Sequence, residues 1–461
     1  MPHRIYTNGG RRNKIQATPG PSSPNAGFTL AAGFTRRYSA AMTITPEIPT
    51  DHRESGRLVS LDAFRGATIA AMLLVNNHMV WSFPPVPAQL LHVPWHGCTL
   101  TDFIFPFFLF IVGVAMPYSD AKRVAAGDGR AYQIAYTARR AMILFAIGVF
   151  LQSVGTGKPV LNMEVLQRIA VCAFAAAFVL RSGTAVQVGS CFALYAAYWI
   201  LMVWVGVSGT TWPEGWDPGK TLAERVDLRI LGRTNNEGLI STLPAITSVI
   251  GGILAGRWLR SNQPSLIKVW GLAGAGLLAA AAGYVLGGEA SPLYRTNILW
   301  MPLNKILWTP SYALWTAGWA AVVLGALYFV MDVVGFRAWA RPFVIYGSNA
   351  IGVYAFTRLF VMWFLIGWKV PKDGISLRFL QISGNRTWPD TYPGELVPFK
   401  NWFCGVFQSF YQNLGLNPDP RSPDLLANAA TWASLTYSFM ILGIGFLFCL
   451  ALWRRRIFFK V

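Results

Sequence analysis

Apolar stretches long enough to cross a lipid bilayer recur through this chain from residue 62 almost to its C-terminal end. A helix of about 20 apolar residues spans the hydrocarbon core and satisfies its own backbone hydrogen bonds there. The periodicity and the breakers predict ten spans, at residues 62–80, 101–119, 134–153, 163–181, 186–206, 238–258, 268–287, 304–330, 342–367 and 428–453. The expected fold class is an all-α polytopic membrane protein, a bundle of about ten transmembrane helices.

The basic residues orient these spans. The 461 residues carry a formal net charge of +19, yet only 13% of them are charged. We exclude a nucleic-acid partner because the Lys and Arg residues gather at the ends of apolar segments, as orientation signals do. Short basic clusters mark alternate connections: Lys122, Arg123, Arg130, Arg139 and Arg140, then Arg181, then Arg257, Arg260 and Lys268, then Arg337 and Arg341, and finally Arg454, Arg455 and Arg456. We therefore expect these connections and both termini to be cytoplasmic, in a multi-pass protein of the cell inner (plasma) membrane.

The chain divides into a polar leader and a membrane domain that contains the predicted spans. Residues 1–57 are rich in Pro, Gly, Ser and Arg, and are predicted to be disordered, with Met42 a candidate start. Residues 58–461 form the transmembrane domain. The long connections 207–237 and 369–427 are expected to be ordered caps on the outer side, and 399–414 an amphipathic surface or re-entrant segment.

Small residues and cysteines have ordinary structural interpretations. Gly251-Gly252 and the trio Gly271, Gly274 and Gly276 are typical of close helix contacts. The five cysteines form no CxxC pair, and three lie inside apolar segments, which favours small buried side chains. A disulfide between Cys98 and Cys404 is the alternative if both face an oxidising compartment.

The first connection contains the groups best suited to chemistry. Five histidines are present; two lie in the leader, and His78, His92 and His96 lie in this connection or at its margin. Imidazoles at a membrane boundary favour proton transfer. His92 is a candidate general base or transient acyl acceptor, and the alternative is an interfacial histidine bonded to a turn. We expect His96 and His78 to be supporting residues.

Two polar residues in the predicted spans, Asn76 and Asp102, could assist His92. Asn76, at the outer end of the first span, could polarise a carbonyl oxygen or hold a histidine tautomer; the alternative is an interhelical hydrogen bond. Asp102 opens the second span and could orient an imidazole or form an ion pair with Arg168.

Other residues are candidates for contacts with ligands. Arg65, with Arg139 and Arg140, could bind phosphates on the cytoplasmic side, although orientation charge alone explains the last two. Trp95 could stack on a sugar ring or anchor the loop at the interface. Metal binding is not expected, because Pro94 interrupts any helix between His92 and His96 and no further ligands complete a site.

These residues belong to a longer series of segments that resembles the heparan-α-glucosaminide N-acetyltransferase family. The matching segments are Leu61-Asp62-Ala63-Phe64-Arg65-Gly66, Val75-Asn76, His92 to Asp102 with Phe105-Pro106-Phe107, Val165 to Ala170, Asn236 to Pro244, Pro302 to Thr309, Pro342-Phe343 and Gly347-Ser348-Asn349-Ala350. They extend over roughly 57–461 in the family's order, which makes the resemblance specific. One departure is His96, where the lysosomal enzyme has asparagine.

The resemblance implies a transmembrane transferase that takes acetyl groups from cytoplasmic acetyl-CoA. It makes His92 the active-site histidine and Asn76 the active-site asparagine, and Asp102 is assigned beside them. The candidates for acceptor binding are Trp95, His96, Arg168, Glu237, Asn304 and Lys305. Those for acetyl-CoA are Arg65, Arg139, Arg140, Ser348 and Asn349. The chain is similar to the shorter bacterial members, and by analogy with the family a homodimer is an alternative to a monomer.

The predicted function is therefore transfer of an acetyl group from acetyl-CoA, without a metal, to an amino sugar or glycan on the extracytoplasmic side. Direct attack by the amine and an acetyl-histidine intermediate both remain open. The alternatives are a sugar or muropeptide transporter, for which intramembrane polar residues serve equally well, and an O-acyltransferase.

Overall fold

The computed structural model describes residues 58–77, 87–156, 160–207, 209, 212–232, 238–371, 396–417 and 428–459. All of them belong to one compact unit, Gly56–Val461. The expected leader, 1–57, lies outside the described residues, as do His78 and Glu237.

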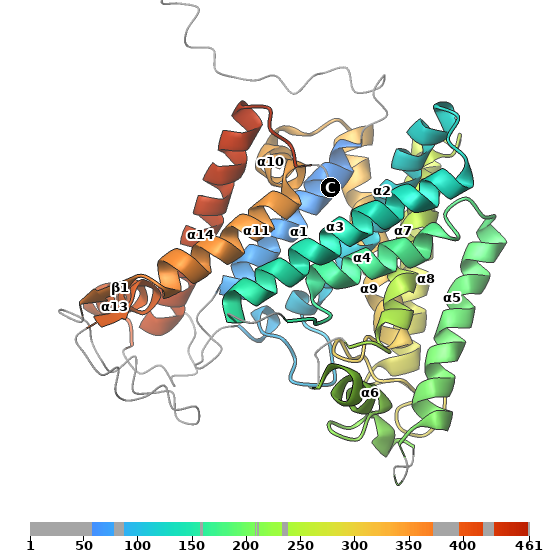
Figure 1. Ribbon diagram of the computed structural model, residues 1–461, viewed down its shortest axis with the longest axis horizontal. Coiled ribbons are helices and arrows are strands. Elements are labelled where there is room, and N and C mark those ends of the chain that lie inside the picture. Colours follow the sequence, from blue (N-terminus) through green and yellow to red (C-terminus); the bar gives the residue numbers. More distant parts are fainter. Residues whose placement is uncertain are drawn as a thin grey trace, which may run out of the picture. The chain divides into compact units, whose positions relative to one another are not determined.

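The described part of the chain is helical apart from its connections and one short ribbon (Figure 1). Within the described residues, eight helical segments are long and apolar enough to cross a membrane. They are α1 (Val59–Asn77), α2 (Ile104–Ala125) with the 3₁₀ turn Leu100–Phe103 before it, α3 (Arg130–Thr156), α5 (Thr184–Trp199) with its extension to Val205, α7 (Thr242–Arg260), α8 (Ser265–Gly287), α9 (Pro310–Tyr328) with its extension to Val333, and α14 (Ala429–Arg454). The predicted fold class, an all-α multi-pass membrane protein, is confirmed.

The predicted count of ten spans is not confirmed. The ninth candidate is a helix pair, Ala338–Ser348 and Ala350–Leu365, bent by 70° at Asn349; it contains α10 (Arg341–Ser348) and α11 (Ala350–Phe360). The prediction at 163–181 corresponds to α4 (Val165–Ala177), whose 13 residues are too few to cross the hydrocarbon core.

Shorter elements lie in the long connections. They are α6 (Leu222–Leu231), α13 (Phe399–Asn413), and strands β1 (Lys369–Pro371) and β2 (Leu396–Pro398), which pair antiparallel. The helix α13 agrees closely with the amphipathic segment predicted at 399–414, and it packs on α14.

Glycines bring the helix pairs together where backbones cross. A Cβ on Gly252 of α7 would lie 2.1 Å from the carbonyl oxygen of Phe110 in α2, and one on Gly276 of α8 would lie 2.6 Å from that of Gly318 in α9. The prediction of close contacts at Gly252 and Gly276 is therefore correct. A Cβ on Gly274 would meet nothing within 4 Å, so that glycine is not needed for contact.

The two ends of the helices differ in chemistry. At one end, Arg260 donates to the carbonyl of Pro117 at 2.9 Å and Arg181 binds Asp120 at 2.8 Å. These contacts join the C-terminal ends of α2 and α7 to the α4–α5 connection, so predicted basic clusters meet in space. The connection that contains His92 meets, at the other end, the connections before α6 and before α9.

The eighth predicted span, 304–330, begins too early. The helix α9 starts at Pro310, and residues 301–309 form a buried connection in which Asn304 Oδ1 accepts from the backbone N–H of Leu307 at 2.8 Å. The apolar side chains of Leu307 and Trp308 are packed inside the protein and do not face lipid. This correction places Asn304 and Lys305 in a loop and not within a span.

Candidate functional site

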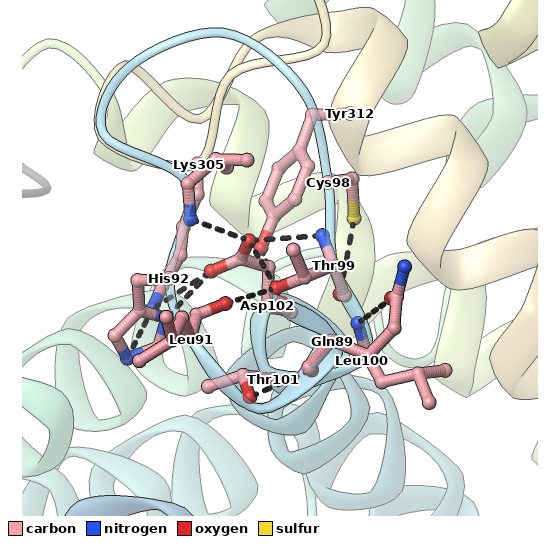
Figure 2. Close-up of polar contacts among 11 residues, drawn as sticks. Gln89, Leu91, His92, Cys98, Thr99, Leu100, Thr101, Asp102, Lys305 and Tyr312 are labelled. Carbon is pink, nitrogen blue, oxygen red and sulfur yellow. Dashed lines mark hydrogen bonds and ion pairs between the residues drawn. The ribbon is translucent and has the colours of Figure 1, made fainter. Parts of the chain in front are cut away.

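A carboxylate, an imidazole and an ammonium group meet where the first connection joins α2 (Figure 2). Nδ1 of His92 lies 2.6 Å from Oδ1 of Asp102. Nζ of Lys305 lies 3.5 Å from the same oxygen and 3.1 Å from Nδ1 of His92. Asp102 and Lys305 are separated by the whole central part of the chain, so the fold, not local sequence, creates this cluster.

Local sequence fixes the carboxylate. Asp102 is the third residue of the turn that Thr99 caps: its Oδ2 accepts from the backbone N–H of Thr99 at 3.1 Å and from the Thr99 hydroxyl at 3.0 Å. The same hydroxyl lies 2.6 Å from the carbonyl of Leu91, and Tyr312 of α9 donates to the carbonyl of Asp102 at 2.6 Å. The aspartate is thus held from both sides before it contacts His92.

This geometry selects a tautomer for His92. In a neutral imidazole, Nδ1 either carries a hydrogen and donates or has a lone pair and accepts. The short contact with the Asp102 carboxylate, which can only accept, makes Nδ1 the donor. The ammonium of Lys305 then acts as a second cation for Asp102, whose side chain is wholly buried. Nε2 keeps its lone pair, with Nζ of Lys305 3.4 Å away, on a side chain that is 36% exposed. The arrangement can accept a proton or attack an electrophile at Nε2.

Of the two partners expected for Asp102, the structure has His92 and not Arg168. Arg168 is buried in α4 and donates to the carbonyl of Gly238 at 2.9 Å and to the hydroxyl of Ser241 at 2.8 Å. Its guanidinium lies 5.1 Å from the ring of Trp308. Arg168 therefore ties α4 to the start of α7 and to the loop before α9.

Asn76 is not joined to His92 among the described residues. It is exposed near the C-terminal end of α1, one residue before the described part of that helix ends. The neighbouring Asn77 bonds back to the carbonyl of Leu73 at 2.8 Å.

Two candidates for acceptor binding support the loop. Trp95 donates through Nε1 to the carbonyl of Trp216 at 2.8 Å, so it anchors the connection before α6. Nδ2 of Asn304 lies 3.3 Å from Nδ1 of His96. Burial lowers the pKa of His96 from its ordinary value of 6.5; the nearby charge of Asp217 raises it by less, and that of Arg295 lowers it further. His96 therefore stays neutral at neutral pH.

The candidates for acetyl-CoA divide into two groups. Arg65 lies 3.4 Å from Asp62 on α1, and the backbones of α1 and α10 touch beside it, since a Cβ on Gly347 would lie 2.1 Å from the carbonyl oxygen of Asp62. This contact brings Arg65 and Ser348 onto adjoining segments. Arg139 and Arg140 lie on α3, with Arg139 exposed and Arg140 beside the ring of Tyr136.

Asn349 is fully buried and already occupied. Its Oδ1 accepts from the backbone N–H of Phe459 at 2.9 Å, and its Nδ2 donates to the carbonyl of Ile457 at 3.1 Å. The residue holds the segment after α14 against the bend between α10 and α11.

Sequence reasoning missed the supporting residues of the cluster. The pattern Thr99-x-x-Asp102 has the spacing of a capping box, which links a side chain at the start of a turn to the residue three positions later. That spacing was available as a signal. No local pattern identifies Tyr312, because its contact with Asp102 depends on how α9 packs against α2.

Comparisons with known proteins find matches to one family. The family model "Heparan-alpha-glucosaminide N-acetyltransferase, catalytic" matches residues 57–294, which include both His92 and Asp102. Among curated proteins, the chain is similar to heparan-alpha-glucosaminide N-acetyltransferase from Homo sapiens, 27% identical over 386 residues, and to that from Mus musculus, 25% identical over 389 residues. The matches cover 69% and 70% of this chain, but only 55% and 57% of those proteins.

Proposed function

We propose a function for this chain from its family: it belongs to the heparan-α-glucosaminide N-acetyltransferase family. The proposed function is to move an acetyl group from cytoplasmic acetyl-CoA to an amino sugar on the other side of the membrane. The observation that carries the proposal is the 2.6 Å contact between His92 and the buried Asp102. This contact leaves the lone pair on Nε2. The atom lies at the end of the helices opposite the connections that carry the clusters of Lys and Arg. A base there can meet an acceptor that never enters the cytoplasm.

The proposed reaction is acyl transfer with His92 as the base. The neutral amine attacks the thioester carbon, a C–N bond forms and the C–S bond breaks. The amine proton passes to Nε2 of His92 and then to the departing CoA thiolate, so the imidazole is regenerated. Asp102 stabilises the transient imidazolium. In the alternative, Nε2 attacks first and carries the acetyl group to the amine.

Two amide or ammonium donors could stabilise the oxyanion that develops on the thioester carbonyl. Lys305 lies within 3.4 Å of Nε2 of His92, which suits a donor to a group that reacts there. Asn76 is the second candidate, at the same end of α1. We also assign Trp95, His96, Asn304 and Arg168 to shaping the acceptor side, with Glu237 as a further candidate.

The donor is assigned to residues of α1, α3 and α10 that lie outside this cluster. Arg65, Arg139 and Arg140 are the proposed contacts for the CoA phosphates, since a guanidinium makes charge-assisted bonds to phosphate oxygens. Ser348 ends α10, whose backbone contacts that of α1 between Gly347 and Asp62, three residues before Arg65. We propose that Asn349 contributes by holding the bend between α10 and α11, because the oxygen and the nitrogen of its side-chain amide both have backbone partners already.

The test separates donor binding from chemistry. Purified protein should be thermally stabilised by CoA, because a ligand that binds only the folded state raises its stability, and should consume acetyl-CoA with at least one member of a panel of amino sugars. His92→Ala should keep the stabilisation and lose transfer. The control Lys220→Ala, at an exposed site 45% accessible, should behave as the wild type.

Other outcomes would identify the alternatives. A transporter without acyl transfer would not be stabilised by CoA, and an O-acyltransferase would release a product that hydroxylamine cleaves under mild conditions. Full turnover in His92→Ala would remove this residue from the mechanism. A labelled acetyl group trapped on the protein in the absence of acceptor would select the acetyl-histidine route.

A further inference from the structure

The side chain of Lys305 ends beside the imidazole that is proposed to react (Figure 2). Its Nζ lies 3.1 Å from Nδ1 and 3.4 Å from Nε2 of His92. These nearly equal distances place Nζ over one face of the imidazole, because an atom in the ring plane that close to both nitrogens would overlap a ring carbon. A primary amine is therefore held against the ring at which the acetyl group is proposed to be transferred.

The loop before α9 fixes the position of this amine. The backbone carbonyl of Lys305 accepts from the N–H of Trp308 at 3.1 Å, and Oδ1 of Asn304 accepts from the N–H of Leu307 at 2.8 Å. At the other end of the side chain, Nζ lies 3.5 Å from Oδ1 of Asp102. A nucleophile that is held at about 3–3.5 Å from a reacting group needs no encounter step before it reacts.

An acetyl group at this site has two amines in reach. In the proposed reaction the acetyl carbon is either bonded to Nε2 of His92 or next to it in the thioester. An acetyl group on Nε2 is coplanar with the imidazole, and a nucleophile attacks a planar carbonyl from one of its faces. Nζ of Lys305 already lies on such a face. The amine of Lys305 therefore competes with the amine of the acceptor.

Acetylation of Lys305 needs no reactant other than acetyl-CoA. The neutral amine attacks the acetyl carbon, a C–N bond forms, and the C–S bond of the thioester breaks. In the acetyl-histidine route, the C–S bond has broken earlier and the bond between the acetyl carbon and Nε2 breaks instead. One amine proton passes to the CoA thiolate, so the products are acetyl-lysine and CoA. The ammonium form, which pairs with Asp102, has no lone pair, so attack waits until its proton leaves.

The modification changes the charge balance of the cluster. Acetyl-lysine is neutral, so the wholly buried carboxylate of Asp102 loses one of its two cationic partners. A buried charge that loses its partner is strongly destabilised. The ammonium that is proposed to stabilise the oxyanion near Nε2 of His92 is lost as well. The modified protein should therefore transfer acetyl groups far more slowly.

We infer that Lys305 is an internal acetyl acceptor: when no amino sugar is bound, the acetyl group passes to its ε-amine and acetyl transfer stops. The inference rests on the proposed function for the identity of the acetyl donor. Among the lysines whose side chains the structure describes, Lys305 alone contacts an imidazole. The modification should therefore be selective for this residue.

The first test incubates the purified full chain with acetyl-CoA that carries a deuterated acetyl group, without acceptor, and locates the label by mass spectrometry. Lys220 is the matched control in the same sample, because it also contacts a carboxylate, that of Glu214 at 3.2 Å, and is more exposed, at 45% against 16% for Lys305. Lys305 should carry at least about tenfold more label than Lys220, and added glucosamine should suppress this label. Equal labelling of the two lysines, in protein that acetylates glucosamine, would overturn the inference.

A second donor separates this inference from the proposed function. N-acetylimidazole delivers acetyl groups from solution and needs no site for CoA. It should also label Lys305 more than Lys220 in the wild type, and the order should reverse in His92→Ala, because Lys220 is the more exposed lysine. Preferential label on Lys305, without transfer from acetyl-CoA to any amino sugar, would contradict the proposed function alone. Transfer to glucosamine, with no preference for Lys305 from either donor, would contradict the inference alone.

The effect on activity is measured on the same samples after the excess donor has been removed. The rate of transfer to glucosamine should fall in proportion to the label on Lys305, and fully labelled protein should be at least about 10²-fold slower, as when one oxyanion donor is removed from other enzymes. Incubation with CoA, which carries no acetyl group, should leave the rate unchanged. Complete labelling of Lys305 with an unchanged rate would contradict the inferred loss of activity.

Discussion

At the scale of single residues, the wholly buried carboxylate of Asp102 determines what its neighbours do. A buried charge is tolerated only when cations and hydrogen-bond donors surround it. Here the Thr99 cap, the imidazole of His92 and the ammonium of Lys305 share that role. The same contacts that stabilise the carboxylate orient the histidine, so structural and proposed catalytic roles coincide.

Replacing this carboxylate by an amide tests the orientation. In Asp102→Asn, the amide can turn its N–H toward Nδ1 of His92 and select the tautomer that has no lone pair on Nε2. We expect transfer to fall by about 10²- to 10⁴-fold, as when the orienting carboxylate of other catalytic histidines is removed. Initial rates of CoA release at saturating acetyl-CoA would measure this.

The donor end provides the internal control. Asp102→Asn should keep the thermal stabilisation by CoA, because the proposed phosphate contacts, on α1 and α3, are not among the residues that contact Asp102. Glu214→Gln, an exposed carboxylate in the connection before α6, should leave the rate as it is. A rate for Asp102→Asn within twofold of the wild type would contradict the proposed tautomer selection.

The sequence indicated that Asp102 would orient an imidazole or form an ion pair with Arg168, but it could not choose between the two. That choice depends on α4, which directs Arg168 to Gly238 and Ser241 instead. Lys305 was expected to bind substrate from within a span, because apolar residues continue across 304–330. Its contact with Asp102 exists only because the connection before α9 is folded into the protein.

At the scale of elements, glycines that look alike in the sequence differ in what surrounds them. Gly276 and Gly274 lie two positions apart on α8, and only Gly276 faces the backbone of α9. The pattern predicted a small-residue face, and the structure shows which of its glycines belong to it. The difference between the two positions gives a matched pair of substitutions.

We expect Gly276→Ala to lower the melting temperature and Gly274→Ala to leave it unchanged or raise it. The first adds a Cβ 2.6 Å from the carbonyl oxygen of Gly318, so α8 and α9 must separate. The second adds helix propensity of about 1 kcal/mol at an open site. Thermal unfolding of both variants in the same detergent would measure this, and an equal loss in both would contradict the assigned contact.

Element boundaries were predicted less well where tertiary contacts override apolar pattern. The prediction at 342–367 missed the bend of 70°, although Gly347-Ser348-Asn349 is a typical breaker sequence. What stabilises the bend is remote: Asn349 bonds to Ile457 and Phe459 beyond α14. A single sequence does not indicate that partner.

At the scale of the whole molecule, the connections rich in Lys and Arg and the connection that contains His92 lie at opposite ends of the helices. Which end faces the cytoplasm can be tested. Cysteines introduced at Ala126, between α2 and α3, and at Lys220, before α6, lie at opposite ends and are both exposed. The distribution of Lys and Arg predicts that the first is cytoplasmic. Lys220→Cys should therefore react with a membrane-impermeant maleimide in intact cells.

The paired variant completes this measurement. Ala126→Cys should react only after the cells are permeabilised, and the unmodified chain, with its five free cysteines, gives the background. The reverse pattern would place His92 in the cytoplasm and contradict transfer across the membrane.

The hydrogen bond from Gly97 to Leu303 has a consequence for turnover. It joins the loop that contains His92 and His96 to the loop before α9, where Asn304 contacts His96 and Lys305 contacts His92. A shift of one histidine would therefore disturb the other. A molecule bound to either loop would therefore also restrict the motion of the reactive imidazole, so part of the rigidity of the reactive group would come from the bound molecule.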